Sequence, residues 1–408
     1  MKRNIKNNSE KEKVLFNETR IEKNATVFLL LIIAASFLVF SPCLKNGFLI
    51  YDDTENVTDN VFITSFSLQH LQAFFTTPLL YMYTPLVYFS FASDYMISGL
   101  NPMMFHLTNV MLHLANIFLV FVFIKLLSDK KEIALITTSL FAVHPLMADT
   151  VAWVSTRSTL LFTLFFLLSL IAYLNYLKSS FRLKFYFLSL ILFLFSSLSK
   201  SSAIILPFVL LLIDYFKQRK LFLKTFAEKI PFFLIAIAIA AITIYFRTDV
   251  STSQTPFMYS LIDKFFILCY SFFACIVRLI VPFNLSAVYS YPEKSNGGLP
   301  FEFYITTLLF IILTIFLFRI NRKEIWFGVL FFFINLAISQ VGFLEDGFAA
   351  NRYAYLPSIG LFFIIGNFYT SSGNKKNIFA FVFLISLIIF SVATFQRVQV
   401  WKDNIALF

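Results

Sequence analysis

Long apolar segments, separated by short connections that carry Lys and Arg, make up most of this sequence. A bilayer core of about 30 Å needs about 20 apolar residues in a helix, with a range of about 17–25. Segments of this kind predict eleven membrane-spanning helices, near residues 25–44, 106–127, 133–147, 158–177, 185–199, 202–216, 230–247, 301–319, 326–342, 356–372 and 377–395. The pattern therefore favours an all-α polytopic membrane protein.

Basic connections set the expected orientation, because Lys and Arg gather in cytoplasmic loops. Such connections occur at 129–131, 178–184, 217–229, 319–323 and 375–376. With these inside, the polar segment 1–24 is cytoplasmic, and the loop 45–105 and the tail 396–408 are extracytoplasmic. A cleaved signal peptide is the alternative for the N-terminus, but the polar lead is long and no small-residue cleavage site follows. We expect one multi-pass transmembrane domain, 25–395, in the cell (inner) membrane.

Two regions do not fit simple crossings. The apolar segment 261–283 would move every later basic connection outside if it crossed, so we expect it to be re-entrant or to lie along the outer interface. In the first outer loop, residues 67–75 and 86–97 show helical periodicity with aromatic faces. That periodicity predicts two interfacial helices.

Composition supports this class and excludes others. Of the 408 residues, 59% are hydrophobic and 13% charged, whereas soluble domains have about 45–50% and about 25%. This excludes a soluble enzyme, and three cysteines are too few for a secreted disulfide scaffold. The formal net charge of +11 belongs mostly to the inner connections, so it indicates no nucleic acid partner. The four histidines show no metal-ligand pattern, and we expect no metal site.

Two adjacent carboxylates, Asp52 and Asp53, lie just outside the first predicted span. Charge is costly near a bilayer, which makes such residues functional candidates. Neighbouring carboxylates repel and so tend to raise the pKa of one of them, which suits a general base acting on a hydroxyl. The alternatives are a solvated loop start or the N-cap of a following helix.

A second group of candidates surrounds the end of the third span, where Pro145 follows His144. Asp149, Trp153 and Arg157 are spaced four apart, so on a helix they share one side. A carboxylate, an aromatic plate and a guanidinium on one face can bind a sugar and a phosphate. The alternative is an interfacial set, with the Trp as an anchor and the Arg snorkelling.

Cations on the expected outer side form the third group. Arg352, next to Tyr353, can clamp a lipid-linked phosphate, or both can belong to an aromatic belt. The acidic residues Glu345 and Asp346 precede them. Lys200, in a tight outer turn, breaks the positive-inside bias and so calls for an anionic partner. Arg278 is likewise a cation within an apolar helix.

A series of short motifs resembles the transmembrane-and-tetratricopeptide-repeat (TMTC-like) membrane glycosyltransferases and their bacterial relatives. In chain order the motifs are FLIYDD (48–53), YTPLVY (83–88), GLNP (99–102), FHLTN (105–109), LHL (112–114), FAVHP (141–145), VAWVSTR (151–157), LSK (198–200), RYAYLPSIGL (352–361) and WKD (401–403). The resemblance spans nearly the whole chain. It implies a GT-C fold and transfer of a sugar from a polyprenyl-phosphate carrier to an acceptor outside the cytoplasm. In animal members the sugar is mannose, moved from dolichyl phosphate to Ser or Thr.

The resemblance places the family's acidic pair on Asp52 and Asp53. It places the family's His-Pro element on His144 and Pro145, and its Trp-x-x-x-Arg element on Trp153 and Arg157. Three departures matter. Relatives usually carry Asp before the Arg of the RYAYLP motif, where this chain has Asn351. Many have Arg at the position of Thr84, and tetratricopeptide repeats normally follow the last span, whereas this chain stops at Phe408.

Together these residues predict a lipid-dependent glycosyltransferase in which Asp52 or Asp53 deprotonates a protein or glycan acceptor. Arg352, Arg157 and Lys200 would stabilise the released lipid phosphate, and Asp149 would orient the sugar. A divalent metal is compatible with this chemistry but not required by it. The rivals are a transporter or flippase of lipid-linked saccharides, which would place polar sites near the midplane, and a non-catalytic membrane scaffold.

Overall fold

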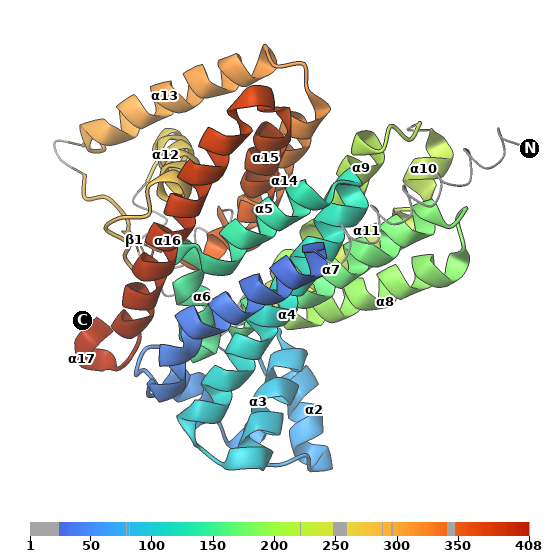
Figure 1. The fold of residues 1–408 in the computed structure, drawn as a ribbon. Coiled ribbons are helices and arrows are strands. Elements are labelled where there is room, and N and C mark those ends of the chain that lie inside the picture. Colours follow the sequence, from blue (N-terminus) through green and yellow to red (C-terminus); the bar gives the residue numbers. More distant parts are fainter. Residues whose placement is uncertain are drawn as a thin grey trace, which may run out of the picture.

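The computed structural model is almost entirely helical (Figure 1). The residues it describes are 24–78, 80, 82–220, 222–247, 259–287, 289–294, 297–340 and 347–407. Nearly all of the predicted cytoplasmic segment 1–24, together with Glu345 and Asp346, lies outside the described residues. Among the described residues, the one sheet consists of two short antiparallel strands, β1 (Tyr289–Ser290) and β2 (Gly347–Ala349).

Each of the eleven predicted spans corresponds to a helix in the structure. These are a first helix, Asn24–Lys45, and α4 (Pro102–Ser128), α5 (Lys131–Val143), α7 (Arg157–Lys178), α8 (Leu183–Ser199), α9 (Leu206–Phe216), α11 (Ile230–Arg247), α13 (Phe301–Phe318), α14 (Lys323–Gln340), α15 (Ser358–Ser371) and α16 (Lys376–Val400). By length and composition, six helices in the described part of the chain can cross a membrane, or seven if a bent pair counts as one span. The all-α polytopic fold class is confirmed, and the orientation of the helices stays a prediction.

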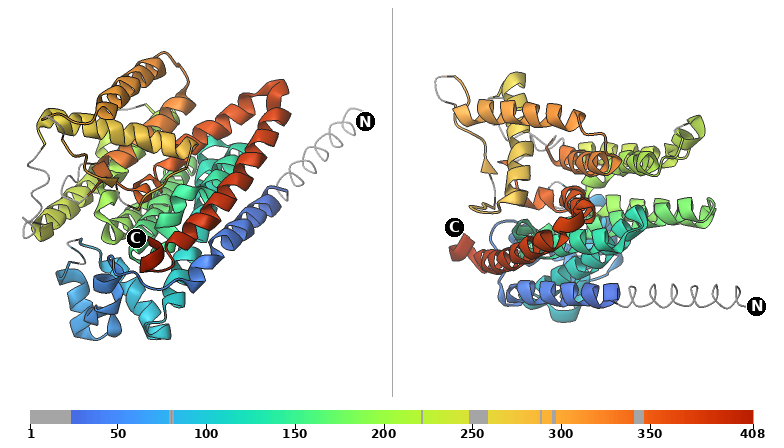
Figure 2. Two further views of the ribbon diagram at one scale, coloured as in Figure 1. Left: turned by 90° about the vertical axis from the view of Figure 1, so that its left-hand side faces the viewer. Right: turned by 45° about the horizontal axis from the view of Figure 1, so that its top comes forward.

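Shorter helices connect these elements. The two helices predicted in the first outer loop are present as α2 (Leu68–Thr76) and α3 (Pro85–Ser98), and the segment predicted to be re-entrant or interfacial forms α12 (Leu261–Ile280). The other short elements are α6 (Ala148–Ala152), α10 (Leu223–Ala227), α17 (Asn404–Leu407), the π-helical turn η2 (Thr54–Thr58), and the 3-10 turns η1 (Ser41–Lys45), η3 (Val61–Thr64), η4 (Pro145–Met147), η5 (Val154–Thr156), η6 (Ser201–Ile205), η8 (Asn351–Ala354) and η9 (Gly373–Lys375). Figure 2 shows α12 and α13 as a pair beside the main bundle.

Local signals explain where the central helices begin and end. The side chain of Asn101 accepts a hydrogen bond from the Met103 N–H at the start of α4, and Pro102 occupies the first helical position, which needs no donor. Asp129, at φ 58°, ends the same helix in the left-handed conformation. At the end of α5 the backbone of His144 is extended before Pro145, and the chain bends by 57°.

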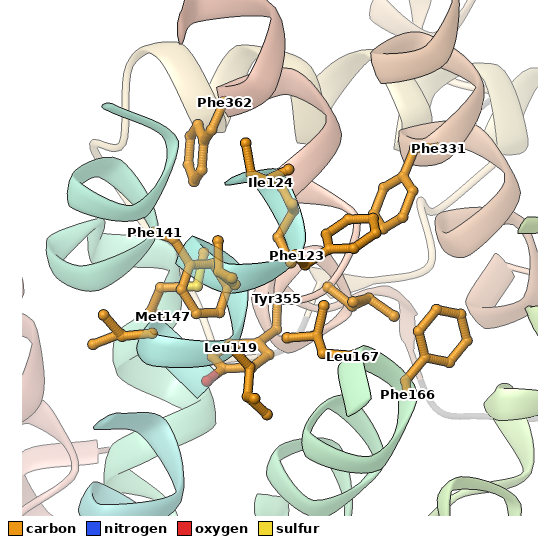
Figure 3. Packing of buried hydrophobic residues seen from close by; sticks show 14 of the residues in the cluster. Leu119, Phe123, Ile124, Phe141, Met147, Phe166, Leu167, Phe331, Tyr355 and Phe362 are labelled. Carbon is orange, nitrogen blue, oxygen red and sulfur yellow. The ribbon is translucent and has the colours of Figure 1, made fainter. Parts of the chain in front are cut away.

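The core lies where α4, α5, α7, α14 and α15 meet. Phe123, Phe141 and Tyr355 pack there against side chains of α7 and α14 (Figure 3). The polar end of Tyr355 is satisfied inside the core, 2.7 Å from Nδ1 of His113. The outer helices, in contrast, expose long runs of Ile, Leu and Phe, as expected of surfaces that face lipid.

The helices α14 and α15 cross at two glycines, Gly328 and Gly360. A Cβ added at either residue would overlap the carbonyl oxygen of the other. Small residues allow this kind of close helix approach in membranes.

We therefore expect Gly360→Ala to destabilise the protein by about 1–3 kcal/mol, the usual cost of overpacking. Thermal unfolding in detergent measures the effect. Gly47→Ala is the matched control, because a Cβ there meets its nearest neighbour at 3.8 Å, an ordinary contact. Equal unfolding midpoints for the two variants would show that the crossing tolerates separation.

Candidate functional site

Asp53 anchors the loop 45–105 to the turn that precedes α7. Its carboxylate accepts hydrogen bonds from the backbone N–H of Leu49, at 3.0 Å, and from both the N–H, at 3.0 Å, and the hydroxyl of Ser155. The residue is fully buried. Its side chain does not cap η2, the turn that follows it. Both oxygens of Asp53 are thus engaged within the protein.

Asp52 differs from its neighbour in exposure. It is partly exposed, whereas Asp53 is 0% exposed. Burial is the main cause that raises the pKa of Asp53 to about 6, and the hydrogen bonds from Ser155 and Leu49 oppose it. One of the two carboxyls thus has a raised pKa, as the sequence predicts. The main cause is desolvation by burial and not repulsion between the two acids.

An aromatic and cationic group surrounds Trp153. Its indole stacks on Trp401, with centroids 5.2 Å apart and planes at 19°, and lies 5.4 Å from the ring of Tyr51. The guanidinium of Arg352 lies 5.2 Å from the Trp153 ring and also 5.2 Å from the ring of Tyr353. Tyr51 directly precedes Asp52, and Asp53 bonds to Ser155, two residues after Trp153, so the structure brings the segment of the predicted acidic pair to Trp153.

Asp149 joins three distant segments. Its carboxylate accepts hydrogen bonds from the Asn351 amide at 2.9 Å, from Nε of Arg397 at 3.1 Å and from the indole N–H of Trp401 at 2.8 Å. It is 2% exposed. The side chain predicted to orient a sugar is therefore engaged with η8 and with the end of α16.

Arg157 is 0% exposed and forms a buried ion pair with Asp94 of α3. Its other hydrogen bonds go to the side-chain oxygen of Asn109 at 2.8 Å, the hydroxyl of Ser90 at 3.0 Å and the carbonyl oxygen of Phe105 at 2.6 Å. The guanidinium thus ties α3 and α4 to the start of α7. Contact with a lipid phosphate would require it to leave these partners.

The prediction that Asp149, Trp153 and Arg157 share one helix face is wrong. Helix α6 ends at Ala152, and the backbone at Trp153 is extended, with φ −91° and ψ 124°. The turn η5 then leads into α7, which begins at Arg157. The break lets the three side chains point to different partners, and the hydroxyl of Thr156 supports it by donating to the Trp153 carbonyl oxygen at 2.5 Å.

His144 contacts α12, and Lys200 contacts the start of α7. Nε2 of the buried His144 is 3.0 Å from the carbonyl oxygen of Leu279 in α12, and its Nδ1 accepts from the N–H of Leu146 at 3.2 Å. Lys200 donates to the Thr159 hydroxyl at 2.9 Å, in the first turn of α7. The ligand-binding roles of both residues stay predictions.

Several residues that contact the predicted site residues were not predicted from the sequence. Ser155, Asp94, Asn109 and Arg397 each bond to a predicted site residue, although no role was assigned to any of them. The contact of Asp94 could have been predicted, because a carboxylate in an aromatic helix near a membrane needs a cation beside it. Within the described residues, no three His, Cys, Asp or Glu side chains gather closely enough to hold a metal ion.

The raised pKa of Asp53 predicts a pH-dependent stability. The carboxyl of an unfolded Asp titrates near about 3.9, below the folded value of about 6. The stability contributed by Asp53 is therefore fully present below about pH 4 and is lost as the pH rises through about 6. The loss amounts to about 3 kcal/mol.

Asp53→Asn removes this titration but leaves the residue buried. We expect the gap in unfolding free energy between wild type and Asp53→Asn to shrink by up to about 3 kcal/mol between about pH 4 and about pH 7.5. Unfolding of both proteins in detergent across that range checks the expectation, with Asp59→Asn as the exposed control. A gap that is constant with pH would contradict it.

Comparisons with known proteins gave structural matches only. No family model matches the sequence, and no curated protein matches it. Among solved structures, the chain is similar to the Archaeoglobus fulgidus oligosaccharyltransferase tethered to an acceptor peptide with an NVT sequon, at 12% identity and a TM-score of 0.43 over 94% of this chain and 55% of that one. It is also similar to the same organism's oligosaccharyltransferase AglB in complex with an inhibitory peptide and a dolichol-phosphate, at 12% identity and a TM-score of 0.42 over 94% and 56%.

The apo form of the Archaeoglobus fulgidus enzyme gives 10% identity and a TM-score of 0.44 over 93% of this chain and 56% of that one. The chain thus spans little more than half the length of these enzymes. At TM-scores below 0.5, this likeness assigns neither an activity nor a substrate to the chain.

Proposed function

We propose that this chain is a membrane glycosyltransferase of the GT-C type. It moves a sugar, which we expect to be mannose, from a polyprenyl-phosphate carrier to a hydroxyl of a protein or glycan on the extracytoplasmic side. The observation that supports the proposal is that the partly exposed Asp52 directly follows Tyr51, whose ring lies 5.4 Å from the Trp153 ring, and that the Arg352 guanidinium lies 5.2 Å from the same Trp153 ring. A carboxylate, an aromatic plate and a cation are the groups that such a transfer needs.

In the proposed reaction, Asp52 takes the proton from the acceptor hydroxyl as the acceptor oxygen bonds to the anomeric carbon. The bond from that carbon to the phosphate oxygen breaks, and the lipid phosphate leaves with the electron pair. The positive charge of Arg352 stabilises the leaving phosphate. Asp53 serves the reaction by holding the loop in place, since its oxygens are already bonded to Leu49 and Ser155.

In this proposal two other candidate residues, Asp149 and Arg157, have structural roles. Asp149 holds η8 and α16 together, and Arg157 holds α3 and α4 against α7. Both act on the reaction through the residues that they position. The proposal therefore reduces the catalytic set of the first outer loop to one carboxylate, Asp52.

Reconstitution tests the proposal. The purified protein is placed in vesicles with polyprenyl-phosphate mannose, a Ser/Thr-containing peptide and an oligosaccharide. We expect glycosylated acceptor and free polyprenyl phosphate in equal amounts. Movement of the intact donor across the bilayer without sugar transfer would support the transporter instead. Neither transfer nor movement, with a panel of polyprenyl-phosphate hexoses, would support the scaffold.

A further inference from the structure

The chain turns after α16, and this turn lies against the start of the loop 45–105. The N–H of Gly47 donates a hydrogen bond to the carbonyl oxygen of Lys402 at 2.9 Å. The N–H of Ile50 donates to the side-chain oxygen of Asn404, also at 2.9 Å, across 354 residues of sequence. Figure 1 shows α17 beside the chain that follows the first helix. The C-terminal residues thus bond to the segment that leads to the acidic pair.

Trp401 anchors this turn in the aromatic group of the candidate site. It is 1% exposed, its indole stacks on Trp153, and its indole N–H donates to the carboxylate of Asp149 at 2.8 Å. The guanidinium of Arg352 lies 5.2 Å from the same Trp153 ring. The start of the turn is therefore fixed to the ring that Arg352 also contacts.

The rest of the WKD motif (401–403) places Asn404. The carboxylate of Asp403 accepts a hydrogen bond from the N–H of Ala406 at 2.9 Å, so it caps α17, which begins at Asn404. Lys402 contributes its backbone, because its carbonyl oxygen bonds to the loop while its side chain is exposed. The turn thus gives a physical role to a motif that takes no step in the proposed reaction.

The backbone around Asp52 is held from both sides. Two residues before it, Ile50 is bonded to Asn404, and one residue after it, Asp53 is bonded to Ser155 at 3.0 Å. A displacement of a reacting group by about 1 Å can slow a reaction by about 10²-fold. Losing the hold on one side frees the chain next to Asp52, although the contact itself lies at the surface and contributes little to folding.

We propose that Asn404 is a positioning residue: through the N–H of Ile50, the turn 401–404 holds the segment 46–53, and with it Asp52, in place against Trp153. The role in transfer rests on the proposed function, in which Asp52 is the base. Asn404 touches neither the donor nor the acceptor. Its effect on the reaction passes through the position of Asp52.

Kinetics of two variants at one position test the role in transfer. We expect Asn404→Ala to lower kcat by about 10- to 100-fold, with a KM for the lipid donor and an unfolding midpoint close to those of wild type. Asn404→Asp keeps an oxygen acceptor of the same size and should restore most of the rate. Ile405→Ala is the matched control, because Ile405 is the next residue and is 93% exposed. Equal rates for Asn404→Ala and Ile405→Ala would overturn the inference.

A double variant shows whether Asn404 acts through Asp52. If it does, Asn404→Ala costs nothing further once the base is gone, because residues that act as a unit are not additive. We therefore expect Asn404→Ala combined with Asp52→Asn to transfer at the rate of Asp52→Asn alone. Losses that multiply would contradict a positioning role.

Hydrogen exchange of the full-length protein in detergent, measured by mass spectrometry, needs no activity. In Asn404→Ala the N–H of Ile50 loses its acceptor, so we expect faster exchange in peptides that cover 46–53 and unchanged exchange in α4. Asn404→Asp should keep the wild-type exchange. Unchanged exchange in 46–53, or an equal increase in α4, would show that Asn404 does not hold this segment locally.

The two measurements separate this inference from the proposed function. Wild-type kcat in Asn404→Ala, in a protein that transfers sugar, overturns the positioning role and leaves the glycosyltransferase intact. Absence of transfer by the wild-type protein removes the proposed function and the role in transfer with it. Exchange that rises only in 46–53 then still supports the hold of Asn404 on the segment.

Discussion

Replacing Asp52 with Asn is expected to slow sugar transfer by about 10²- to 10⁴-fold, the usual contribution of a general base. The substitution removes the basic oxygen but keeps the size of the side chain. Asp52 is partly exposed, and substitutions at exposed positions usually change stability by less than about 0.5 kcal/mol. We therefore expect the loss in kcat with an unfolding midpoint close to that of wild type. Initial rates with saturating donor and acceptor measure it.

Glu55→Gln is the matched control, because it removes an exposed carboxylate three residues further along the same loop. It should transfer at the wild-type rate. Asp53→Asn serves as a contrast. Its defect should appear in stability and in the yield of folded protein, because the new amide group faces the N–H donors of Leu49 and Ser155. Full activity of Asp52→Asn would remove Asp52 as the base.

The second large effect concerns the buried ion pair between Arg157 and Asp94. Asp94→Ala leaves a guanidinium that is 0% exposed without its counter-ion. Breaking a buried pair from one side costs about 3–5 kcal/mol. We expect a large fall in the unfolding midpoint, measured in detergent, whereas Asp59→Ala at an exposed position of the same loop, 45–105, has little effect.

A double variant separates a structural role from a ligand-binding one. Asp94→Leu combined with Arg157→Met replaces the pair by apolar groups, which is often neutral or stabilising for buried pairs. We expect partial recovery, since Asn109 and the Phe105 carbonyl oxygen lose their donor. If Arg157 instead binds the lipid phosphate, Asp94→Ala should leave the midpoint unchanged and the double variant should lose transfer.

The helices were predictable because hydropathy and stop signals act locally. The eleven apolar segments correspond to helices, and the pair Pro145 and His144 marked a true break. The two helices α2 and α3 of the loop 45–105 followed from their periodicity in the same way. Asp52 and Asp53 are candidates from the sequence alone because carboxylates near a membrane span are rare, and their catalytic role stays a prediction.

The side-chain partners were not predictable, because they depend on contacts between residues far apart in sequence. Trp153 interrupts a segment without Gly or Pro, and the anchor of the following turn, Asp53, lies 102 residues from Ser155. Asp149 meets Trp401 across 252 residues. No local pattern shows whether a carboxylate will face a ligand or a distant indole.

The partners of Lys229 were also not predictable from the local sequence. It belongs to the basic connection 217–229, which the sequence predicts to be an exposed cytoplasmic loop, yet Lys229 is fully buried. Its ammonium lies 2.5 Å from the carboxylate of Asp214 and donates to the hydroxyl of Tyr173 at 2.5 Å. A charge counted for topology is here part of a buried network that joins α7, α9 and the start of α11.

The configuration of the product tests the proposed mechanism most directly. In that mechanism one carboxylate, Asp52, activates the acceptor for a single displacement at the anomeric carbon, and a single displacement inverts that centre. The measurement is an NMR analysis of the glycosylated acceptor made by the wild-type protein from polyprenyl-phosphate mannose of known anomeric configuration. This mechanism predicts the inverted anomer. A product of retained configuration would contradict it, because retention requires a covalent intermediate and a second nucleophile.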